Sequence, residues 1–390
     1  MNRTPASPAK DRAHTWSRWL AIGAVFLSVA ELSARIDDAV IWSAPLFSPY
    51  TEDWLMIRDS LGVRGRPNYR FRKWRMNNEG FRGSDMRVAP APGTSRVVLL
   101  GASDTFGMSE SEGHEYPARM QAMLDSLAPG RFDVVNAALP GMSVPAMTRY
   151  YQQVVARIRP SFVFVYPSPS FYLFLDPPRP VYVPPPSSRT DNPGKIDAEL
   201  FQSRLIAQGR EAVKELIPAA LLTYSRERYL RRVRAEHDPS WFWTSVPADR
   251  MVLFGRDLDR LVATIQAAGA TVILVTHTNR FVGATPGVRH RDRRHLVSLL
   301  AKDYPRASAD VLVAVDSAAN SHLRDIARER HAAVVEAEGR IPPTGQYFAD
   351  YTHFTDDGAG VMARLLTAGL LRLAAGADTS RAMTFGDARE

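Results

Sequence analysis

Five short runs of apolar, mostly β-branched residues constrain the fold of this chain more than any other feature. Each has four to six residues, and stretches with helical spacing separate them; the runs cover residues 96–100, 132–136, 161–166, 271–276 and 332–335. Runs of this length and composition are typical of strands that are buried on both faces of a parallel sheet. The repeated alternation of strand and helix therefore predicts an α/β layer fold with a mostly parallel central sheet and right-handed crossovers.

The stretches between the runs have the spacing of amphipathic helices. In residues 117–127, Pro117 occupies a first-turn position, and Met120 and Leu124 share one face with further apolar residues. The same spacing predicts helices at residues 144–158, 251–268, 307–328 and 358–373. The interval between the third and fourth runs is irregular, because it begins with Pro-rich sequence and continues with a helical region near residues 197–236. We interpret residues 175–245, approximately, as an insertion or lid.

The N-terminus has the pattern of a targeting or anchoring segment. Basic residues precede an apolar run at residues 19–30, which Glu31 interrupts. As a helix, this run would be about 18 Å long, shorter than the roughly 30 Å hydrocarbon core of a bilayer. If the run is extended to residues 16–32, its length of seventeen residues is at the lower limit for a helix that crosses a bilayer. The pattern fits a secretory signal, an uncleaved signal anchor with its basic start in the cytoplasm, or a buried helix of a cytosolic domain.

We expect residues 1–42 to form the cytoplasmic basic start and the anchor or signal segment. This predicts a single-pass inner-membrane protein with its catalytic domain in the periplasm, or a secreted protein if the segment is cleaved. The remaining chain has no second apolar run of eighteen residues, so a polytopic membrane protein is not expected.

Composition and motifs exclude several classes of function. The 390 residues include no cysteine, which excludes disulfides, thiolate zinc sites and a cysteine nucleophile. The formal net charge of +8 comes from scattered arginines rather than a basic stripe, so no nucleic-acid partner is expected. No His, Asp and Glu cluster has metal-ligand spacing, and neither a phosphate-binding loop nor a dinucleotide-binding glycine turn is present. We therefore expect no metal, nucleotide or other cofactor.

Two segments that lie far apart in the sequence together supply a serine, a base and an orienting acid. Ser103 follows the first run and Gly101, so its hydroxyl is expected at the carboxyl edge of the sheet. Asp350 precedes His353 by three residues, just ahead of a helix that Thr355 can cap. A serine hydroxyl needs a base, and that base needs an orienting acid. Ser103, His353 and Asp350 are therefore the candidate catalytic residues.

These segments resemble the conserved blocks of the SGNH/GDSL hydrolases. Gly101-Ala102-Ser103-Asp104 resembles the first block, with Ala102 where the family usually has Asp, and Asp350-Tyr-Thr-His353 is similar to the last block, D-x-x-H. Residues 135–141 resemble the second block, and residues 76–83 (Met-Asn-Asn-Glu-Gly-Phe-Arg-Gly) look like the leader segment of membrane-anchored bacterial members. The resemblance covers about residues 76–374.

The resemblance implies a three-layer, flavodoxin-like SGNH hydrolase fold over residues 95–376. An N-terminal hydrophobic helix and a lead-in segment, residues 43–94, would precede it, and residues 377–390 would form a flexible tail. The implied activity is that of a serine esterase, in which the amides of Ser103 and Gly141 hold the oxyanion. The implied substrate is an acyl or acetyl ester, with a cell-surface polysaccharide as the expected carrier. An acyltransferase with the same triad, or a degenerate protein that only binds a glycan or a partner, are the alternatives.

The third block departs from the family pattern, whose Asn donates its side-chain amide to the oxyanion. Counted along residues 160–172, Ser170 falls where that Asn would lie, and its hydroxyl could donate one hydrogen bond instead. Loss of one oxyanion donor typically lowers the rate by about 10²–10³. Asn136 is expected to end a strand and bond to backbone. His277 ends the fourth run at the same sheet edge as Ser103, and is expected either to contact substrate or to be a polar loop residue.

Overall fold

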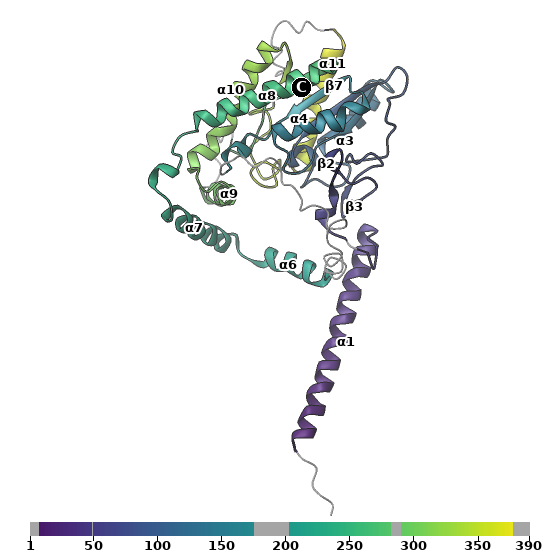
Figure 1. Ribbon diagram of the computed structural model, residues 1–390, viewed down its shortest axis with the longest axis vertical. Coiled ribbons are helices and arrows are strands. Elements are labelled where there is room, and N and C mark those ends of the chain that lie inside the picture. Colours follow the sequence, from purple (N-terminus) through teal and green to yellow (C-terminus); the bar gives the residue numbers. More distant parts are fainter. Residues whose placement is uncertain (1–7, 49, 175–202, 282–289, 377–390) are drawn as a thin grey trace, which may run out of the picture. The chain divides into compact units, whose positions relative to one another are not determined.

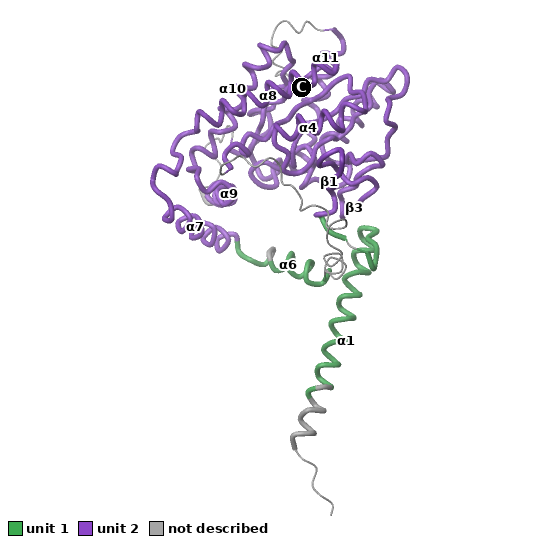
Figure 2. The backbone as a smooth tube through the Cα atoms, viewed as in Figure 1, with its two compact units in different colours: residues 1–52, 188–218 green, residues 53–187, 219–390 purple. Residues whose placement is uncertain are grey.

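The computed structural model describes residues 8–48, 50–174, 203–281 and 290–376 (Figure 1). It divides into two compact units, which Figure 2 colours separately. Unit 1 comprises residues 1–52 and 188–218, and unit 2 comprises residues 53–187 and 219–390. The Pro-rich start of the expected insertion and the expected tail at residues 377–390 lie outside the described residues.

Unit 1 is built from two helices, α1 (Pro8–Trp42) and α6 (Arg204–Leu216). Within α1, residues Arg18–Trp42 are long and apolar enough to cross a membrane, by length and composition. Glu31, which interrupts the apolar run, lies inside α1. Its carboxylate pairs with Arg35 one turn later and accepts hydrogen bonds from Ser203 Oγ (2.7 Å) and the first N–H groups of α6. The carboxylate thus caps α6 at the end where the helix dipole favours negative charge.

Unit 2 contains a five-stranded parallel sheet in the order β6-β5-β7-β8-β9. Each of the five predicted runs forms one strand: β5 (Ser95–Gly101), β6 (Phe132–Asn136), β7 (Phe162–Tyr166), β8 (Thr271–Val275) and β9 (Ala333–Val335). This order is the flavodoxin-like one, in which the topology switches at the first strand. It confirms the predicted fold class and places the topological switch point at the carboxyl ends of β5 and β7.

Helices cover both faces of the sheet, so the domain has three layers. Alternate residues of β5 point into different cores: Val98 and Leu100 join one cluster, and Val97 and Leu99 join the other. The first core includes residues of α4 (Val144–Gln153), α8 (Ala248–Ala267) and α10 (Ala309–Glu329), and the second those of α3 (Tyr116–Leu127) and α11 (Asp356–Ala374). All five helices coincide with predicted ones, except that the last four residues of the predicted helix 144–158 form a 3₁₀ helix, η2 (Val155–Ile158).

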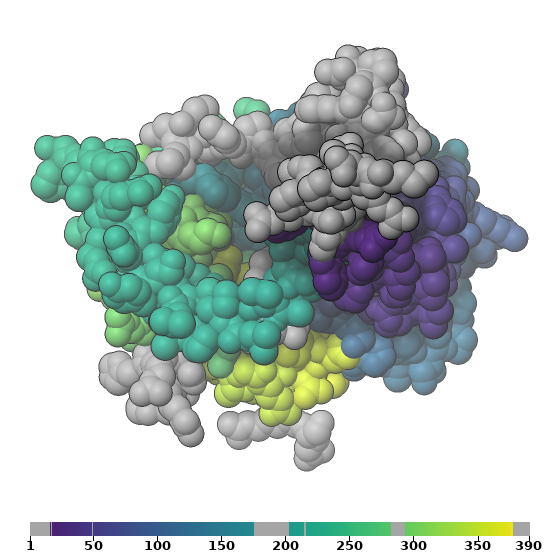
Figure 3. All heavy atoms as spheres, turned by 90° about the horizontal axis from the view of Figure 1, so that it is seen from below, coloured from purple at the N-terminus to yellow at the C-terminus, as the bar shows by residue number. Residues whose placement is uncertain are grey.

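The lead-in segment contains elements that the sequence did not predict, whereas the insertion contains helices in the region predicted near residues 197–236. The lead-in forms two small antiparallel hairpins, β1 (Met56–Asp59) with β2 (Gly62–Gly65) and β3 (Arg70–Phe71) with β4 (Trp74–Arg75). Strands this short carry too little alternation to be recognised. In the insertion, α7 (Ala219–Ala235) packs against α9 (His290–Asp303), and Figure 3 shows teal α7 beside green α9. Short helices complete the described chain: η1 (Glu52–Leu55), α2 (Ser103–Phe106), η3 (Pro169–Leu173) and η4 (Pro239–Trp241).

Candidate active site

Ser103 lies at the turn where β5 leads into the short helix α2. It is the first residue of α2, and its side chain is half-buried at the carboxyl edge of the sheet. The turn is tight because Gly101 has no side chain: a Cβ there would collide with the Thr105 side chain and lie 3.1 Å from the Tyr166 carbonyl oxygen. A larger residue at position 101 would therefore displace the turn that presents the serine.

Ser103, His353 and Asp350 form one chain of hydrogen bonds. Ser103 Oγ lies 2.9 Å from His353 Nε2, and His353 Nδ1 lies 2.7 Å from Asp350 Oδ2. The other oxygen of Asp350 accepts hydrogen bonds from the backbone N–H groups of Thr352 and His353, each at 2.9 Å. Because these bonds fix the carboxylate and the imidazole within one short loop, the histidine is held in the orientation that a serine–histidine–aspartate triad requires.

Nearby charges shift the pKa values of both members of this pair. Burial acts to raise the pKa of the Asp350 carboxyl, but the hydrogen bond to His353 and the two backbone N–H groups outweigh it and lower the pKa. Burial acts to lower the pKa of His353, but the Asp350 hydrogen bond and the charges of Asp104, Asp350 and Glu110 raise it to about 9. The imidazolium form of His353 is therefore strongly favoured by its surroundings.

A second carboxylate, Asp104, faces the same ring nitrogen of His353. Its Oδ1 lies 3.6 Å from His353 Nε2, while its Oδ2 bonds to Ser168 Oγ (3.1 Å) and to His277 Nε2 (3.2 Å). Sequence reasoning treated Asp104 only as part of a motif. No sequence signal identified this role, since the partners come from the ends of β7 and β8 and from the loop before α11.

His277 is enclosed between two carboxylates. Its Nδ1 lies 2.9 Å from Asp316 Oδ2 in α10, its Nε2 bonds Asp104, and its ring stacks on Tyr166. Burial acts to lower its pKa, but the charge of Asp316 and the hydrogen bonds to Asp104 and Asp316 raise the pKa to about 10. The side chain is buried and both ring nitrogens are engaged. His277 is thus a polar residue of the loop after β8, as one of the two expectations had it, but it is buried. Instead of presenting a nitrogen to substrate, His277 lies behind Asp104 with both ring nitrogens bonded to carboxylates.

The backbone amides of Ser103 and Gly141 are candidate oxyanion donors. Among the described residues, neither amide has a hydrogen-bond acceptor, and Gly141 adopts φ +74°, which favours glycine. Ser170, the third expected donor, lies in η3, where its Oγ accepts a hydrogen bond from the Tyr304 hydroxyl (3.1 Å). It keeps its own proton for donation.

Ser168 lies closer to the nucleophile than the sequence count suggested, since that count placed it where the family has Gly and chose Ser170 as the donor. The register pairs Gly101 with Tyr166, so Ser103 and Ser168 each lie two residues beyond the same level of the sheet. Ser168 is buried and donates to Asp104, next to the nucleophile. Asn136 has the expected backbone role, because its amide donates to the Thr105 carbonyl oxygen (3.0 Å) and its Oδ1 accepts from Ala138 N–H.

The leader segment, residues 76–83, supports the far end of α2. Arg82 is almost fully buried; its guanidinium donates to the Gly107 carbonyl oxygen (3.0 Å), pairs with Glu115 (3.4 Å), and lies over the Phe106 ring. Glu110, in the loop between α2 and α3, is a buried carboxyl that the sequence did not reveal. Burial raises the pKa of Glu110 to about 8, although Arg82 and His353 act to lower it.

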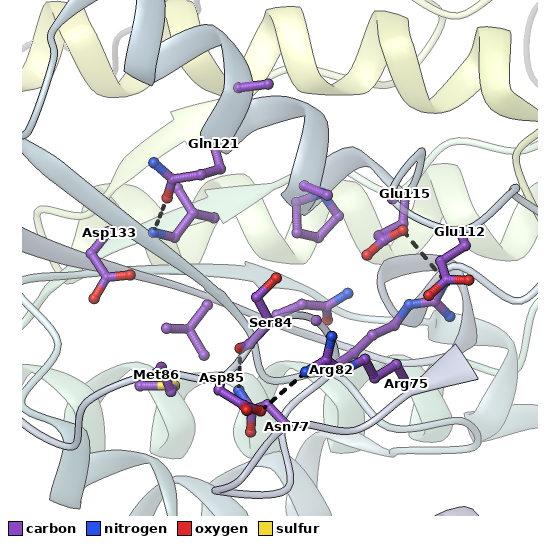
Figure 4. A pocket seen from close by; sticks show the side chains of 18 of the residues that line it. Arg75, Asn77, Arg82, Ser84, Asp85, Met86, Glu112, Glu115, Gln121 and Asp133 are labelled. Atoms are coloured by element: carbon purple, nitrogen blue, oxygen red, sulfur yellow. Dashed lines mark hydrogen bonds and ion pairs between the residues drawn. The ribbon is translucent and has the colours of Figure 1, made fainter. Parts of the chain in front are cut away.

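A cavity of about 470 Å³ lies at the edge strand β6 and does not include the three candidate catalytic residues (Figure 4). Its walls carry charged and amide side chains, labelled in Figure 4, including Arg82, Glu115 and Gln121. Gln121 accepts a hydrogen bond from Val134 N–H (2.6 Å) and donates to the Phe132 carbonyl oxygen, so it covers the open edge of β6. In the described part of the chain, no group of three His, Asp or Glu side chains could hold a metal ion.

Comparisons with known proteins give weak likenesses only. No family model matches the chain, and no curated protein sequence matches it. Solved structures that resemble it include an alpha/beta hydrolase enzyme from the metagenome of Lake Arreo, Spain, with 16% identity over 70% of this chain and 94% of that one and a TM-score of 0.40. An acetyl xylan esterase variant from Geobacillus stearothermophilus has 13% identity over 71% and 95%, with a TM-score of 0.39. A lipase/acylhydrolase from Enterococcus faecalis has 13% identity over 71% and 95%, with a TM-score of 0.40.

Proposed function

We propose that this protein is a serine esterase that cleaves an acyl or acetyl ester, with Ser103 as nucleophile, His353 as base and Asp350 as orienting acid. The observation that carries the proposal is the unbroken hydrogen-bonded chain from Ser103 Oγ through His353 to Asp350. The position supports it too, because open α/β sheets bind ligands beyond the carboxyl ends of their strands, at the topological switch point.

In the proposed mechanism, His353 Nε2 takes the proton from Ser103 as the hydroxyl oxygen attacks the ester carbonyl carbon. Asp350 holds the imidazole in place and stabilises the imidazolium that forms. The amides of Ser103 and Gly141, with the hydroxyl of Ser170, stabilise the oxyanion. His353 then protonates the departing alcohol, and a water molecule activated by the same base releases the acyl group and regenerates Ser103.

We also propose that α1 anchors the protein in the inner membrane, with unit 2 in the periplasm. The length and apolar composition of residues Arg18–Trp42 support this placement, and the basic residues that precede them support a cytoplasmic N-terminus. In that location the accessible esters include acylated or acetylated cell-surface polysaccharides, which we propose as the substrate class.

The experiment that tests the esterase is a comparison of variants of the full chain on 4-nitrophenyl acetate. Ser103→Ala and His353→Ala should each lower kcat/KM by roughly 10³-fold or more, because triad members act as a unit. Ser109→Ala, an exposed serine in the following loop, is the matched control and should be neutral. Wild-type rates in Ser103→Ala would overturn the assignment.

Acceptor sugars distinguish a hydrolase from an acyltransferase with the same triad. With a sugar added at increasing concentration, a hydrolase continues to release the free acid, whereas a transferase forms the acylated sugar. A protein that binds a glycan without turnover would release neither product.

A further inference from the structure

A second cavity in unit 2, of about 720 Å³, lies between the start of α7, the start of α9 and the segment that follows β8. Its described walls contain cationic and neutral side chains and no carboxylate: Ala219, Ala220, Thr223, Tyr224, Arg280, Arg294, His295 and Leu296. We propose that this cavity is a subsite for an anionic group of the ester substrate, and that Arg280 is the residue that binds this group. The inference rests on the proposed esterase and adds the charge of its substrate.

Arg280 joins the cavity to the loop of the candidate triad. Its backbone N–H donates to the carbonyl oxygen of Tyr351 (2.8 Å), the residue that follows Asp350. Its Nη2 lies 3.2 Å from the position that a Cβ on Gly345 would occupy, in the loop that leads to Asp350. The guanidinium therefore lies next to the chain segment that carries two of the three catalytic residues.

The guanidinium of Arg280 has no carboxylate partner among the described residues, and its Nε is buried without a hydrogen bond. Partly buried arginines elsewhere in this unit do have partners: Arg324 pairs with Glu336 (2.7 Å) and Arg330 with Asp259 (2.5 Å). A buried donor without an acceptor destabilises a folded protein. An oxyanion of the substrate would provide the missing acceptor.

The other polar residues of the cavity leave its positive charge uncompensated. Thr223 donates to the Ala219 carbonyl oxygen and bonds to His295 Nδ1 (2.9 Å), which fixes that wall without adding negative charge. Arg294 is neutralised by Glu227, so Arg280 supplies the net charge. Guanidinium groups bind carboxylate and phosphate through paired hydrogen bonds. The expected substrate therefore carries a carboxylate or a phosphate, as an ester of a uronic acid or of a phosphorylated sugar does.

The test compares acetyl esters that differ only in charge, using the full chain. The probes are acetylated methyl glucoside (neutral), acetylated methyl glucuronoside (carboxylate) and acetylated methyl glucoside 6-phosphate (phosphate). The wild type should prefer at least one anionic ester over the neutral ester by about 10-fold or more in kcat/KM, the effect of a charged hydrogen bond. The ratio of kcat/KM between the two anionic esters shows whether the subsite favours a carboxylate or a phosphate.

Variants of Arg280 assign the preference to this side chain. Arg280→Gln should abolish it by raising KM for the anionic ester while kcat and the rate on the neutral ester stay unchanged. Arg280→Lys should retain part of it, because it keeps the charge but not the paired donors. Arg260→Gln, an exposed arginine on α8, is the matched control and should keep the preference. Thermal unfolding of each variant checks that the fold is intact.

Calorimetric titration with methyl glucuronoside, methyl glucoside and methyl glucoside 6-phosphate gives an answer that does not depend on turnover. If neutral and anionic esters are hydrolysed with equal kcat/KM, and charged and neutral sugars bind equally well, the inference about Arg280 is wrong while the esterase proposal stands. If no ester is hydrolysed, the esterase proposal fails. Binding of an anionic sugar that Arg280→Gln abolishes would then still support the cationic subsite, and equal binding of charged and neutral sugars would overturn it.

Discussion

His353 Nε2 faces two oxygen atoms, Ser103 Oγ at 2.9 Å and Asp104 Oδ1 at 3.6 Å. The first is the group that the base must deprotonate, and the second favours the protonated form of the same ring. Asp104 therefore stabilises the imidazolium that forms during attack, but it also favours that form in the resting protein. The balance between these effects sets the pH at which the site works.

This balance predicts an alkaline pH profile. Only neutral His353 can act as base, and its pKa is raised to about 9, so kcat/KM on a neutral ester should rise with pH and level off above about 9. Asp104, Asp350 and Glu110 are the charged groups that raise this pKa. Asp104→Asn removes one of them, so it should move the rise to lower pH.

The measurement is kcat/KM against pH for wild type and Asp104→Asn, with Glu112→Gln as control because Glu112 is exposed and pairs with Arg70. An unchanged profile in Asp104→Asn would mean that Asp104 does not act on His353.

Ser170 and Ser168 can be separated by their effects on turnover. If Ser170 donates to the oxyanion, Ser170→Ala should lower kcat by roughly 10-fold or more with little change in KM, because the bond forms mainly in the transition state. Ser170→Asn should preserve or raise activity. Steady-state kinetics of both variants, with circular dichroism to check folding, measure this. A large loss of kcat in Ser168→Ala with no effect in either Ser170 variant would instead favour Ser168, which contacts Asp104.

At the scale of elements, the leader segment acts as a support for the nucleophile helix. Arg82 and Glu115 form a buried ion pair beneath α2, with side-chain exposures of 2% and 5%. Arg82→Met leaves the Glu115 carboxylate buried without its partner, so it should lower the free energy of unfolding by about 3–5 kcal/mol. The exposed pair of Arg75 and Asp85 supplies the control: Arg75→Met should change stability by about 1 kcal/mol or less.

Urea unfolding of the two variants measures the difference. Equal stabilities would show that the leader segment does not support α2.

The sequence predicted the sheet because five buried parallel strands require continuous β-branched runs, and such runs are visible along the chain. It also predicted that Ser103, Asp350 and His353 lie together, since each follows a recognisable strand or loop signal. The hairpins of the lead-in were missed because their strands are too short to show alternation.

Contacts between distant elements were missed for a different reason. Asp104 is hydrogen-bonded to His277 and Ser168, which follow β8 and β7. The backbone N–H of Arg280 is hydrogen-bonded to Tyr351, in the loop of the candidate triad. Such partners become neighbours only through the strand order. For the same reason, counting along one segment singled out Ser170, whereas the pairing of β5 with β7 draws attention to Ser168.

At the scale of the whole molecule, α1 predicts where the protein is found. Leu27 and Val29 are exposed near the middle of the candidate span of α1, so Leu27→Arg with Val29→Arg should prevent stable insertion, since each charge costs about 3 kcal/mol at the centre of a membrane helix. Leu221→Arg, at an exposed leucine of α7, is the control.

Carbonate extraction of cell membranes measures the effect: the wild type and the control should remain with the membranes, and the double variant should not. N-terminal sequencing of the membrane protein distinguishes an anchor from a cleaved signal. Recovery of the wild type in the soluble fraction with residues 1–42 intact would contradict the anchor.

The central claim is that Ser103 is a nucleophile activated by His353. Its most direct test is reaction of the full chain with a fluorophosphonate probe, followed by mass spectrometry of the labelled peptide. The account predicts one modified residue, Ser103, with labelling abolished in Ser103→Ala and strongly slowed in His353→Ala. Labelling of a different serine, or equal labelling of wild type and Ser103→Ala, would contradict it.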